Sequence, residues 1–251
     1  MADVLGIDIG GTGIKAAPVD LAAGHFTAER LKLPTPRPAE PAAVAEVIGQ
    51  LVQHFGWDGP IGITFPGVVM SGTIRTAPNL HPEWVGVDAG AFLGAAAGSP
   101  ATVLNDADAA GLAEMRFGAG KNKRGTVLII TLGTGIGSAL FYEGVLVPNT
   151  EFGHIEVHGH DAERRASERA REEEHLGWGK WAGRVDTYLD RLEALLSPDL
   201  IIIGGGVSSK SDKFLPRLSL RAPVVPASLH NDAGIVGAAM AAAARKSLFA
   251  V

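Results

Sequence analysis

The stretch VLGIDIGGTG, residues 4–13, is an apolar strand pattern that runs directly into a glycine-rich turn. A second stretch of this kind, VLIITLGTGIG at residues 127–137, follows about half a chain later. Glycine has no Cβ, so it lets backbone N–H groups approach an oxygen-rich ligand closely and permits positive φ. A threonine inside each turn adds a hydroxyl donor. The repetition predicts a duplicated strand–turn–strand hairpin that binds phosphate.

Neither turn fits the common nucleotide-binding loops. The residues after Gly13 are typical of a strand, whereas a dinucleotide-binding fingerprint enters a helix at that point. No Gly-Lys-Ser/Thr element is present for a Walker-type loop. One glycine turn alone is weak support for phosphate binding, because glycines after a strand also form ordinary hairpins. The pair favours a hairpin from each half of the chain that clamps phosphates.

The composition is that of a compact protein, with 251 residues, 46% hydrophobic and 20% charged. A net charge of −5 disfavours broad binding to nucleic acid or to an anionic membrane. The sequence contains no cysteine, which excludes disulfides and thiolate metal sites and is compatible with a reducing compartment. We see no secretory leader and no apolar run long enough for a membrane span, so we expect a cytoplasmic protein.

The predicted elements occur in a similar order twice. The first series consists of strands at 3–9, 13–20 and 26–33, a helix at 42–54, a strand at 61–65, a hairpin at 68–76, a helix at 88–97 and a strand at 101–104. The second consists of a helix at 107–117, strands at 126–131, 136–142 and 144–147, helices at 161–175 and 178–196, a strand at 200–203 and a helix at 232–247. This order predicts an α/β protein of two lobes with a cleft between them.

Asn105 and Asp106 directly follow the strand at 101–104, where a ligand site opens in α/β proteins. A carboxylate there is suited to accept a hydroxyl proton during attack on phosphorus. The alternative is that Asp106 only caps the following helix, and both roles can hold together. Asp108 is interpreted as a first-turn acid favoured by the helix dipole. Asp8, at the mouth of the first turn, is suited to hold Mg²⁺ through its hydration shell.

The segment Glu151-Phe152-Gly153-His154 places a carboxylate and an imidazole on either side of a glycine. Such a pair can hydrogen-bond several hydroxyls at once, which is what a polyhydroxyl ligand needs. A zinc site is disfavoured, since no cysteine and no His-Glu-x-x-His helix is present. Asn79 is a loop amide that could join them or be an ordinary turn residue. The triple glycine 204–206 either packs against a flat ring or permits a strand-to-helix turn.

Together and in this order, these residues resemble the ROK family of sugar kinases, which has the actin-like ATPase (ribonuclease H-like) fold. The resemblance spans essentially the whole chain and implies two lobes, each a mixed five-stranded sheet with helices. It implies an N-terminal lobe of residues 1–105 with a C-terminal helix at about 235–251, holding the sugar and the first phosphate turn. Residues 106–234 would form the other lobe, with the second turn and the donor site.

The resemblance also implies roles for individual residues. Asp106 matches the catalytic aspartate of the family. The residues implied to bind sugar are Asn79, Asn105, Asp106, Glu151, His154, Glu163 and Gly67. Those implied to bind the phosphates or the rest of the donor are Asp8, Gly10, Gly11, Thr12, Lys15, Thr131, Gly133, Thr134, Gly135, Gly204, Gly205 and Gly206.

One loop departs from the family pattern. Typical members follow the Glu-x-Gly-His element with a cysteine-rich zinc loop that uses the histidine as a ligand. Here residues 159–163 (GHDAE) stand in its place without a thiol, so the resemblance implies no zinc site, and the position of Glu163 depends on a rebuilt loop. With residues 148–154 (PNTEFGH) and 63–67 (ITFPG), the chain is similar to the zinc-free branch of polyphosphate glucokinases and glucomannokinases.

The sequence thus predicts phosphoryl transfer from polyphosphate or ATP to the 6-hydroxyl of glucose, with mannose as a further acceptor, Asp106 as general base and Mg²⁺ near Asp8. The alternatives are a kinase for N-acetylmannosamine or fructose, or a non-catalytic sugar-responsive ROK regulator. The family implies a homodimer, and no nucleic-acid or membrane partner is expected. A polyphosphate chain needs a positive track, for which the candidates are Lys15, Lys121, Lys123, Arg124, Lys180, Arg184 and Lys210.

Overall fold

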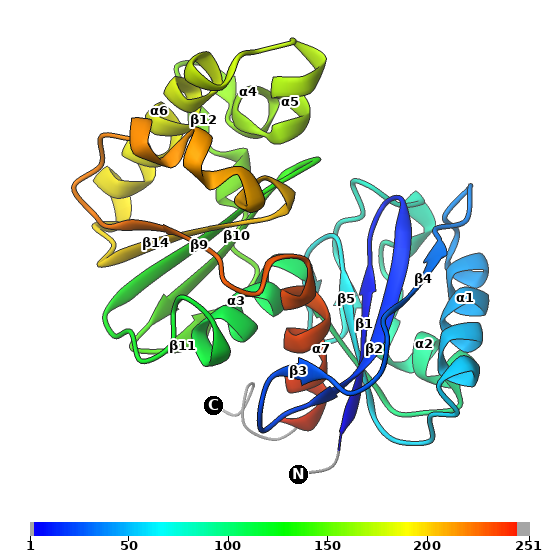
Figure 1. Cartoon of the computed structure of the whole chain (residues 1–251). Helices are drawn as coiled ribbons and strands as arrows, with labels where there is room; N and C mark the ends of the chain where they lie inside the picture. The colour runs from blue at the N-terminus through cyan, green and yellow to red at the C-terminus, as the bar shows by residue number, and fades with distance from the viewer. Residues whose placement is uncertain (1–2, 245–251) are drawn as a thin grey trace. The chain divides into compact units, whose positions relative to one another are not determined.

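The computed structural model describes residues 3–244 and divides into two compact units (Figure 1). The first unit comprises Met1–Ala113 and Asp232–Val251, and the second comprises Glu114–Asn231. Each unit is built around one mixed sheet with helices. The boundary between the units falls inside helix α3 (Asp106–Phe117).

The sheet of the first unit has the strand order β3-β2-β1-β5-β8, with β4 also paired to β2. Its strands are β1 (Val4–Ile9), β2 (Gly13–Asp20), β3 (His25–Phe26), β4 (Leu31–Pro34), β5 (Ile61–Phe65) and β8 (Ala101–Asn105). β1 and β2 are antiparallel, whereas β1, β5 and β8 are parallel. Five strands were predicted and six are found, because the polar, exposed residues 27–30 split the expected strand at 26–33 into β3 and β4.

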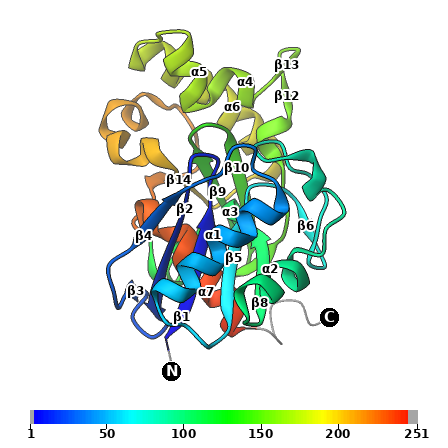
Figure 2. The ribbon, with the colours of Figure 1, turned by 90° about the vertical axis from the view of Figure 1, so that its right-hand side faces the viewer.

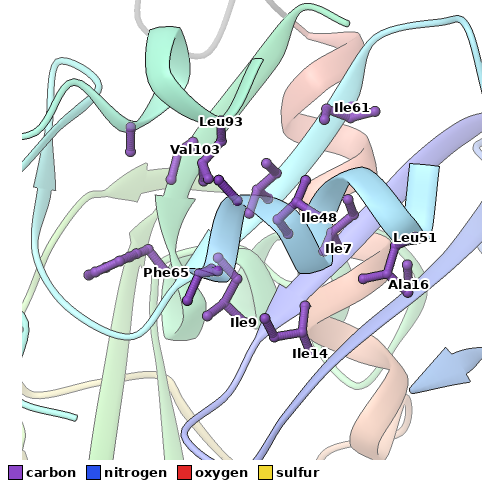
Figure 3. Close-up of a cluster of buried hydrophobic side chains, with 14 of the residues drawn as sticks. Ile7, Ile9, Ile14, Ala16, Ile48, Leu51, Ile61, Phe65, Leu93 and Val103 are labelled. Atoms are coloured by element: carbon purple, nitrogen blue, oxygen red, sulfur yellow. The ribbon is translucent and has the colours of Figure 1, made fainter. Parts of the chain in front are cut away.

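Helices cover both faces of this sheet. Apolar residues at helical spacing bury one side of α1 (Pro41–His54), and α1 packs with α2 (Ala89–Ala97) on one face (Figure 2). The resulting core joins odd-numbered β1 residues such as Ile7 to Ile48 and Leu51 of α1 (Figure 3). Each such side chain contributes about 1.5–3 kcal/mol when fully buried. The small hairpin of β6 (Val69–Met70) and β7 (Thr73–Ile74) follows β5.

The other face of the same sheet is covered by α7 (Ala233–Ala243), which contacts β1, β5 and β8. Glycines allow the helix to lie very close: a Cβ at Gly6 or Gly62 would collide with the α7 backbone. Nearly all of the apolar residues of α7 are buried in this contact. Packing inside the unit therefore accounts for the apolar stretch at 235–244, and the predicted helix end at 247 lies outside the described residues.

The sheet of the second unit has five strands, as the family resemblance implied, in the order β11-β10-β9-β14-β15. The fifth strand, β15, was not among those located from the sequence pattern. They are β9 (Thr126–Leu132), β10 (Ile136–Tyr142), β11 (Val145–Val147), β14 (Leu200–Gly204) and β15 (Val224–Pro226). An antiparallel hairpin, β9–β10, again lies beside a parallel strand, β14. The two sheets therefore share the arrangement that the two glycine turns predicted.

The segment 156–175 differs from the single helix predicted at 161–175. It forms a hairpin of β12 (Glu156–Val157) and β13 (His160–Asp161), followed by short helices α4 (Glu163–Ala166) and α5 (Glu168–Glu173). Ser167 ends α4 with extended backbone, and its hydroxyl accepts the N–H of Ala170 at 3.2 Å to begin α5. α4 contacts both α5 and the long α6 (Trp178–Leu196). No helix among residues 3–244 is long and apolar enough to cross a membrane.

Candidate active site

The first glycine turn joins β1 to β2 and is closed by the N–H of Gly10, which donates to the carbonyl of Gly13 at 3.1 Å. Thr35, which follows the last residue of β4, also holds the turn: its hydroxyl donates to the carbonyl of Gly10 at 2.5 Å. None of the turn glycines has positive φ, so that part of the sequence argument is wrong here. Close approach favours glycine at Gly10 instead, where a Cβ would lie 3.1 Å from the carbonyl oxygen of Gly13. A Cβ at Gly13 would meet the flexible end of the Lys32 side chain, which can move away. Thr12 at the tip is exposed.

Asp8 is held by neighbours in the sheet. Its register partners are Thr64 on β5 and Lys15 on β2. The Thr64 hydroxyl donates to the Asp8 carboxylate at 2.7 Å and accepts the N–H of Ile9 at 3.2 Å. Lys15 Nζ lies 3.3 Å from the other carboxylate oxygen, so the charge of Lys15 is paired within the site. The sequence reasoning missed Thr64, for which a hydroxyl inside the otherwise apolar strand IGITF was the available signal.

Asn105 and Asp106 lie where β8 ends, at the same sheet edge as the carboxyl ends of β1 and β5. The Asn105 side chain donates to the carbonyl of Gly67 at 3.1 Å and accepts the N–H of Asp108 at 3.0 Å. Asn105 is thus the residue that caps α3, and the alternative of a cap at Asp106 is wrong. Asp106 is the half-buried first residue of the helix, and its carboxylate accepts the N–H of Ala107 at 2.8 Å.

The loop that carries Gly67 and Asn79 closes this half of the site. A Cβ at Gly67 would collide with the carbonyl of Thr76 in the same loop, so only glycine fits at this position. Thr76 also accepts the N–H of Val68 at 2.9 Å. Asn79 is exposed, and its backbone lies beside Gly11 of the first turn. The first unit therefore brings the predicted residues at Asp8, the first turn, Gly67, Asn79 and Asn105–Asp106 to one region.

The second glycine turn joins β9 to β10 in the second unit. The N–H of Gly133 donates to the carbonyl of Gly135 at 3.0 Å, and the carbonyl of Gly133 accepts the N–H of Arg169 at 3.1 Å. A Cβ at Gly133 would meet no atom within 4 Å, so this side of the residue is uncovered, while its N–H and carbonyl are already bonded within the protein. Thr134 is exposed, whereas Thr131 is engaged in β9, where it pairs with Gly204 of β14.

Glu163 lies against this turn. Its carboxylate accepts the N–H of Ile136 at 2.8 Å and faces Arg169 at 3.9 Å. A Cβ at Gly135 would come within 2.5 Å of the same carboxylate. The rebuilt loop thus still places a glutamate beside the second turn.

The segment with Glu151 and His154 is anchored on β10. Ser138 donates its hydroxyl to the carbonyl of Thr150 at 2.7 Å and accepts the N–H of Phe152 at 3.0 Å. Gly153 is buried against β10, and a Cβ there would collide with the carbonyl of Ile136, so the position requires glycine. These contacts set the backbone from which the carboxylate of Glu151 and the imidazole of His154 project.

Asp161 orients the imidazole of His154, with Oδ2 lying 3.0 Å from Nδ1. The hydrogen bond from Asp161, assisted by the charges of Glu163 and Glu151, raises the pKa of His154. Desolvation acts to raise the pKa of Asp161, yet the bonds from His154 and from the Arg164 N–H outweigh it and the pKa is lowered. Although Glu151 as a residue is exposed, desolvation of its carboxyl raises its pKa, and Glu163 adds to this while His154 opposes it.

Asp161 was not among the predicted site residues. Its signal in the sequence was weak, since nothing in GHDAE distinguishes a carboxylate that binds a histidine from one that faces solvent. The β12–β13 hairpin, which pairs Glu156 with Asp161, folds it back toward His154. Pairing of this kind depends on the turn at residues 158–159 and not on any local motif.

The triple glycine forms the end of β14 and the start of a 3-10 helix, Gly206–Lys213. Gly205 has a φ of 80°, and a Cβ there would collide with the backbone of Leu132. Its carbonyl accepts the N–H of Ser208 at 3.1 Å. A strand-to-helix turn is therefore what this glycine segment makes, and contact with a donor remains a prediction for it.

A Mg²⁺ ion fits the donor set of Asp8, because Mg²⁺ is commonly held by one or two carboxylates together with waters and substrate phosphates. Each Asp8 oxygen accepts one hydrogen bond from a neighbour and keeps a further lone pair. Within residues 3–244, no group of three or more His, Asp and Glu side chains is arranged to hold a metal.

The candidate cations of a polyphosphate track are distributed over separate places. Lys123 and Arg124 line one cavity of the second unit, and Lys180 and Arg184 line another. Lys210 faces Glu168 at 3.7 Å. Lys15, Lys210 and Arg184 are each paired with a carboxylate, so they are weaker candidates than the cavity cations Lys123, Arg124 and Lys180.

Each unit has an antiparallel hairpin with a glycine turn beside parallel strands, which is the two-unit α/β class that the sequence predicted. The profile of the ROK family matches residues 4–175. The chain is 54% identical over 240 residues to a polyphosphate glucokinase of Mycobacterium tuberculosis (strain CDC 1551 / Oshkosh), with 95% of this chain and 91% of that protein covered. The chain therefore belongs to the ROK family.

Solved structures agree with this assignment. An inorganic polyphosphate/ATP-glucomannokinase from Arthrobacter sp. strain KM matches with a TM-score of 0.95 and 49% identity, covering 98% of this chain and all of that one (100%). A ROK family glucokinase from Streptomyces griseus, in complex with glucose and AMPPNP, matches with a TM-score of 0.83 and 28% identity over 96% and 99% of the two chains. The fold is the actin-like ATPase fold of ROK sugar kinases, as the sequence predicted.

Proposed function

We propose that the protein is a glucokinase that transfers a phosphoryl group from inorganic polyphosphate or ATP to the 6-hydroxyl of glucose. The observation that carries this proposal is the place of Asp106: it begins α3 beside Asn105, which caps the helix, at the sheet edge that also holds Asp8 and the first glycine turn. The identity to polyphosphate glucokinase and the likeness to the polyphosphate/ATP-glucomannokinase support both donors.

The reaction needs a general base, hydrogen-bond donors to the phosphates and residues that bind the sugar. Asp106 accepts the proton of the 6-hydroxyl while that oxygen bonds to phosphorus and the bridging P–O bond to the rest of the donor breaks. The N–H groups and threonine hydroxyls of the two turns stabilise the charge on the transferring group. Asp8 would hold Mg²⁺ through its hydration shell, and the ion would supply positive charge against the phosphates.

The sugar ligands in this proposal are Asn79, Asn105, Glu151, His154 and Glu163, with Gly67 holding Asn105 in place. Asp161 keeps the Nδ1 side of His154 occupied, so that Nε2 is available to a sugar hydroxyl. A carboxylate thus does the orienting for which typical family members use zinc, and we propose that the protein binds no zinc. On the basis of the family resemblance, we also propose that the protein is a cytoplasmic homodimer.

The deciding experiment is a matrix of donors and acceptors. Purified protein with Mg²⁺ is given ATP or long-chain polyphosphate, together with glucose, mannose, fructose or N-acetylmannosamine, and each sugar phosphate is measured. Formation of glucose 6-phosphate from both donors is the expected result. Phosphorylation of N-acetylmannosamine or fructose in preference to glucose would show that glucose is not the main acceptor. Sugar binding without turnover would indicate a regulator.

Replacing the base isolates its role. Asp106→Asn preserves the size of the side chain and its place at the start of α3, but cannot take up the proton. We expect kcat to fall by roughly 10²–10⁴ while glucose binding, followed by isothermal titration, stays close to wild type. The matched control is Asp88→Asn at the start of α2, whose carboxylate only caps that helix. Near-normal turnover by Asp106→Asn would exclude it as the base.

A further inference from the structure

A cavity of about 220 Å³ opens in the second unit between the β12–β13 hairpin, α4 and α6. These elements contact one another and lie together in Figure 2. Its lining has no carboxylate and contains three cationic residues and two histidines, which are Arg165, Lys180, Arg184, His158 and His160. The glucokinase chemistry proposed above uses none of these five side chains.

The positive charge of the cavity is only partly neutralised. Arg184 is held by Glu174 in a bidentate pair of 2.7 and 2.6 Å, and this pair keeps the pKa of Glu174 below its ordinary value. Arg165 and Lys180 belong to none of the ion pairs found within residues 3–244. Two cations therefore remain to meet an anion.

Tyr188 forms part of the cavity wall. The residue is 1% exposed, and its hydroxyl is buried without a hydrogen-bond partner. Burial and the charge of Glu163 raise the pKa of this hydroxyl, so it stays protonated and adds no negative charge to the wall. Because the hydroxyl is covered by protein, the contacts available to a ligand are those of the cationic side chains.

The size of the cavity restricts that molecule. Its volume of about 220 Å³ is below the roughly 300–1,000 Å³ of pockets for drug-sized organic ligands, which suits a single phosphate group. Gly183, in the interior of α6, helps to form the space, because a Cβ there would meet no atom within 4 Å. Glycine destabilises a helix interior relative to alanine, so this position keeps space open at a cost to the helix.

The cavity is joined to the second glycine turn by a short stretch of chain. Glu163, the first residue of α4, binds the N–H of Ile136 just after the turn, and Arg165 lies two residues further on. Arg169 donates its N–H to the carbonyl of Gly133 in the turn itself. The second turn and the cavity are therefore both bordered by residues of α4.

We propose that this cavity binds a phosphate group of the polyphosphate donor, at a distance from its reacting end. The inference rests on the proposed function, since it adds a contact for the same donor. A polyphosphate chain carries a negative charge on every unit, so a remote cationic cavity adds affinity for it. ATP ends in a nucleoside after three phosphates and gains nothing there.

The test uses the full-length protein and compares donors. The double variant Arg165→Gln/Lys180→Gln removes both unpaired charges, and Gly183→Leu fills the space without changing charge. We expect each to weaken binding of long-chain polyphosphate, measured by isothermal titration calorimetry, by about fivefold, and to leave the KM for ATP within about twofold. Arg191→Gln, an exposed cation on α6 outside the cavity, and Gly183→Ala are the matched controls and should bind polyphosphate as wild type does.

Unchanged polyphosphate binding by the double variant, or an equal loss in Arg191→Gln, would overturn the proposal. Tighter binding of orthophosphate than of tripolyphosphate at this cavity would overturn the donor chain as its ligand. A wild-type protein that phosphorylates no sugar refutes the proposed function instead. In that case the calorimetric comparison of the variants with wild type still tests whether the cavity binds polyphosphate.

Discussion

At the scale of single residues, His154 shows how one carboxylate sets the behaviour of a sugar ligand. Asp161 binds Nδ1 at 3.0 Å and raises the pKa of His154 above its ordinary value of 6.5. The ring is therefore more often charged near neutral pH than a histidine in water. The stabilisation from this pair is complete below about pH 6.5 and is lost as the pH rises through the higher pKa of the folded protein.

Asp161→Asn should move the pKa of His154 back toward its ordinary value, which NMR titration of the ring measures. Because the imidazole would no longer be held in one orientation, we expect the KM for glucose to rise about fivefold, with a smaller change in kcat. Glu156→Gln removes a charge from the same hairpin without touching His154 and serves as the control. An unchanged titration of His154 in Asp161→Asn would show that the hydrogen bond does not set its pKa.

At the scale of elements, two helices use interior glycine for opposite reasons. Gly237 of α7 packs against the backbone of Ala109 in α3, where a Cβ would collide. Gly183 of α6 borders open space. The residue type is the same, but packing around the helix decides whether a side chain is tolerated.

The same substitution at these two positions should therefore have opposite effects. We expect Gly237→Ala to lower the free energy of unfolding by about 1–3 kcal/mol because α7 must move away from α3. Gly183→Ala should raise it by about 1 kcal/mol through helix propensity. Thermal unfolding of both variants beside wild type measures the difference, and a loss of stability in Gly183→Ala would show that the space beside α6 is needed for the fold.

At the scale of the whole molecule, a chain with a net charge of −5 must bind a polyanion through local cations. Long-chain polyphosphate releases more counterions than ATP on binding. We therefore expect the KM for polyphosphate to rise with salt at least twice as steeply, on a logarithmic scale, as the KM for ATP, by the counterion-release relation. Steady-state kinetics from low to moderate potassium chloride test this, with sucrose as an uncharged control, and equal slopes would argue against a cationic track.

Much of the fold follows from local patterns. Alternation and glycine turns located β1–β2 and β9–β10, and helical spacing located α1 and α6, because these signals lie within a few residues of one another. The segment 156–175 was mispredicted, since Ser167 ends one helix and begins the next, and β12 pairs with β13 only through a turn. The second sheet edge, with β15, was also not predicted, because its short strand lacks a pattern of its own.

The sequence by itself determined the family, the α/β class and the residue types that chemistry requires, because order and spacing along the chain carry that information. Only the tertiary structure decided that Asn105 caps α3, that Thr64 and Lys15 hold Asp8, and that Asp161 binds His154. It alone gathered Arg165, Lys180 and Tyr188 around one cavity. The reason is physical: strand register and helix packing join residues that are distant in the chain, and no local pattern encodes those contacts.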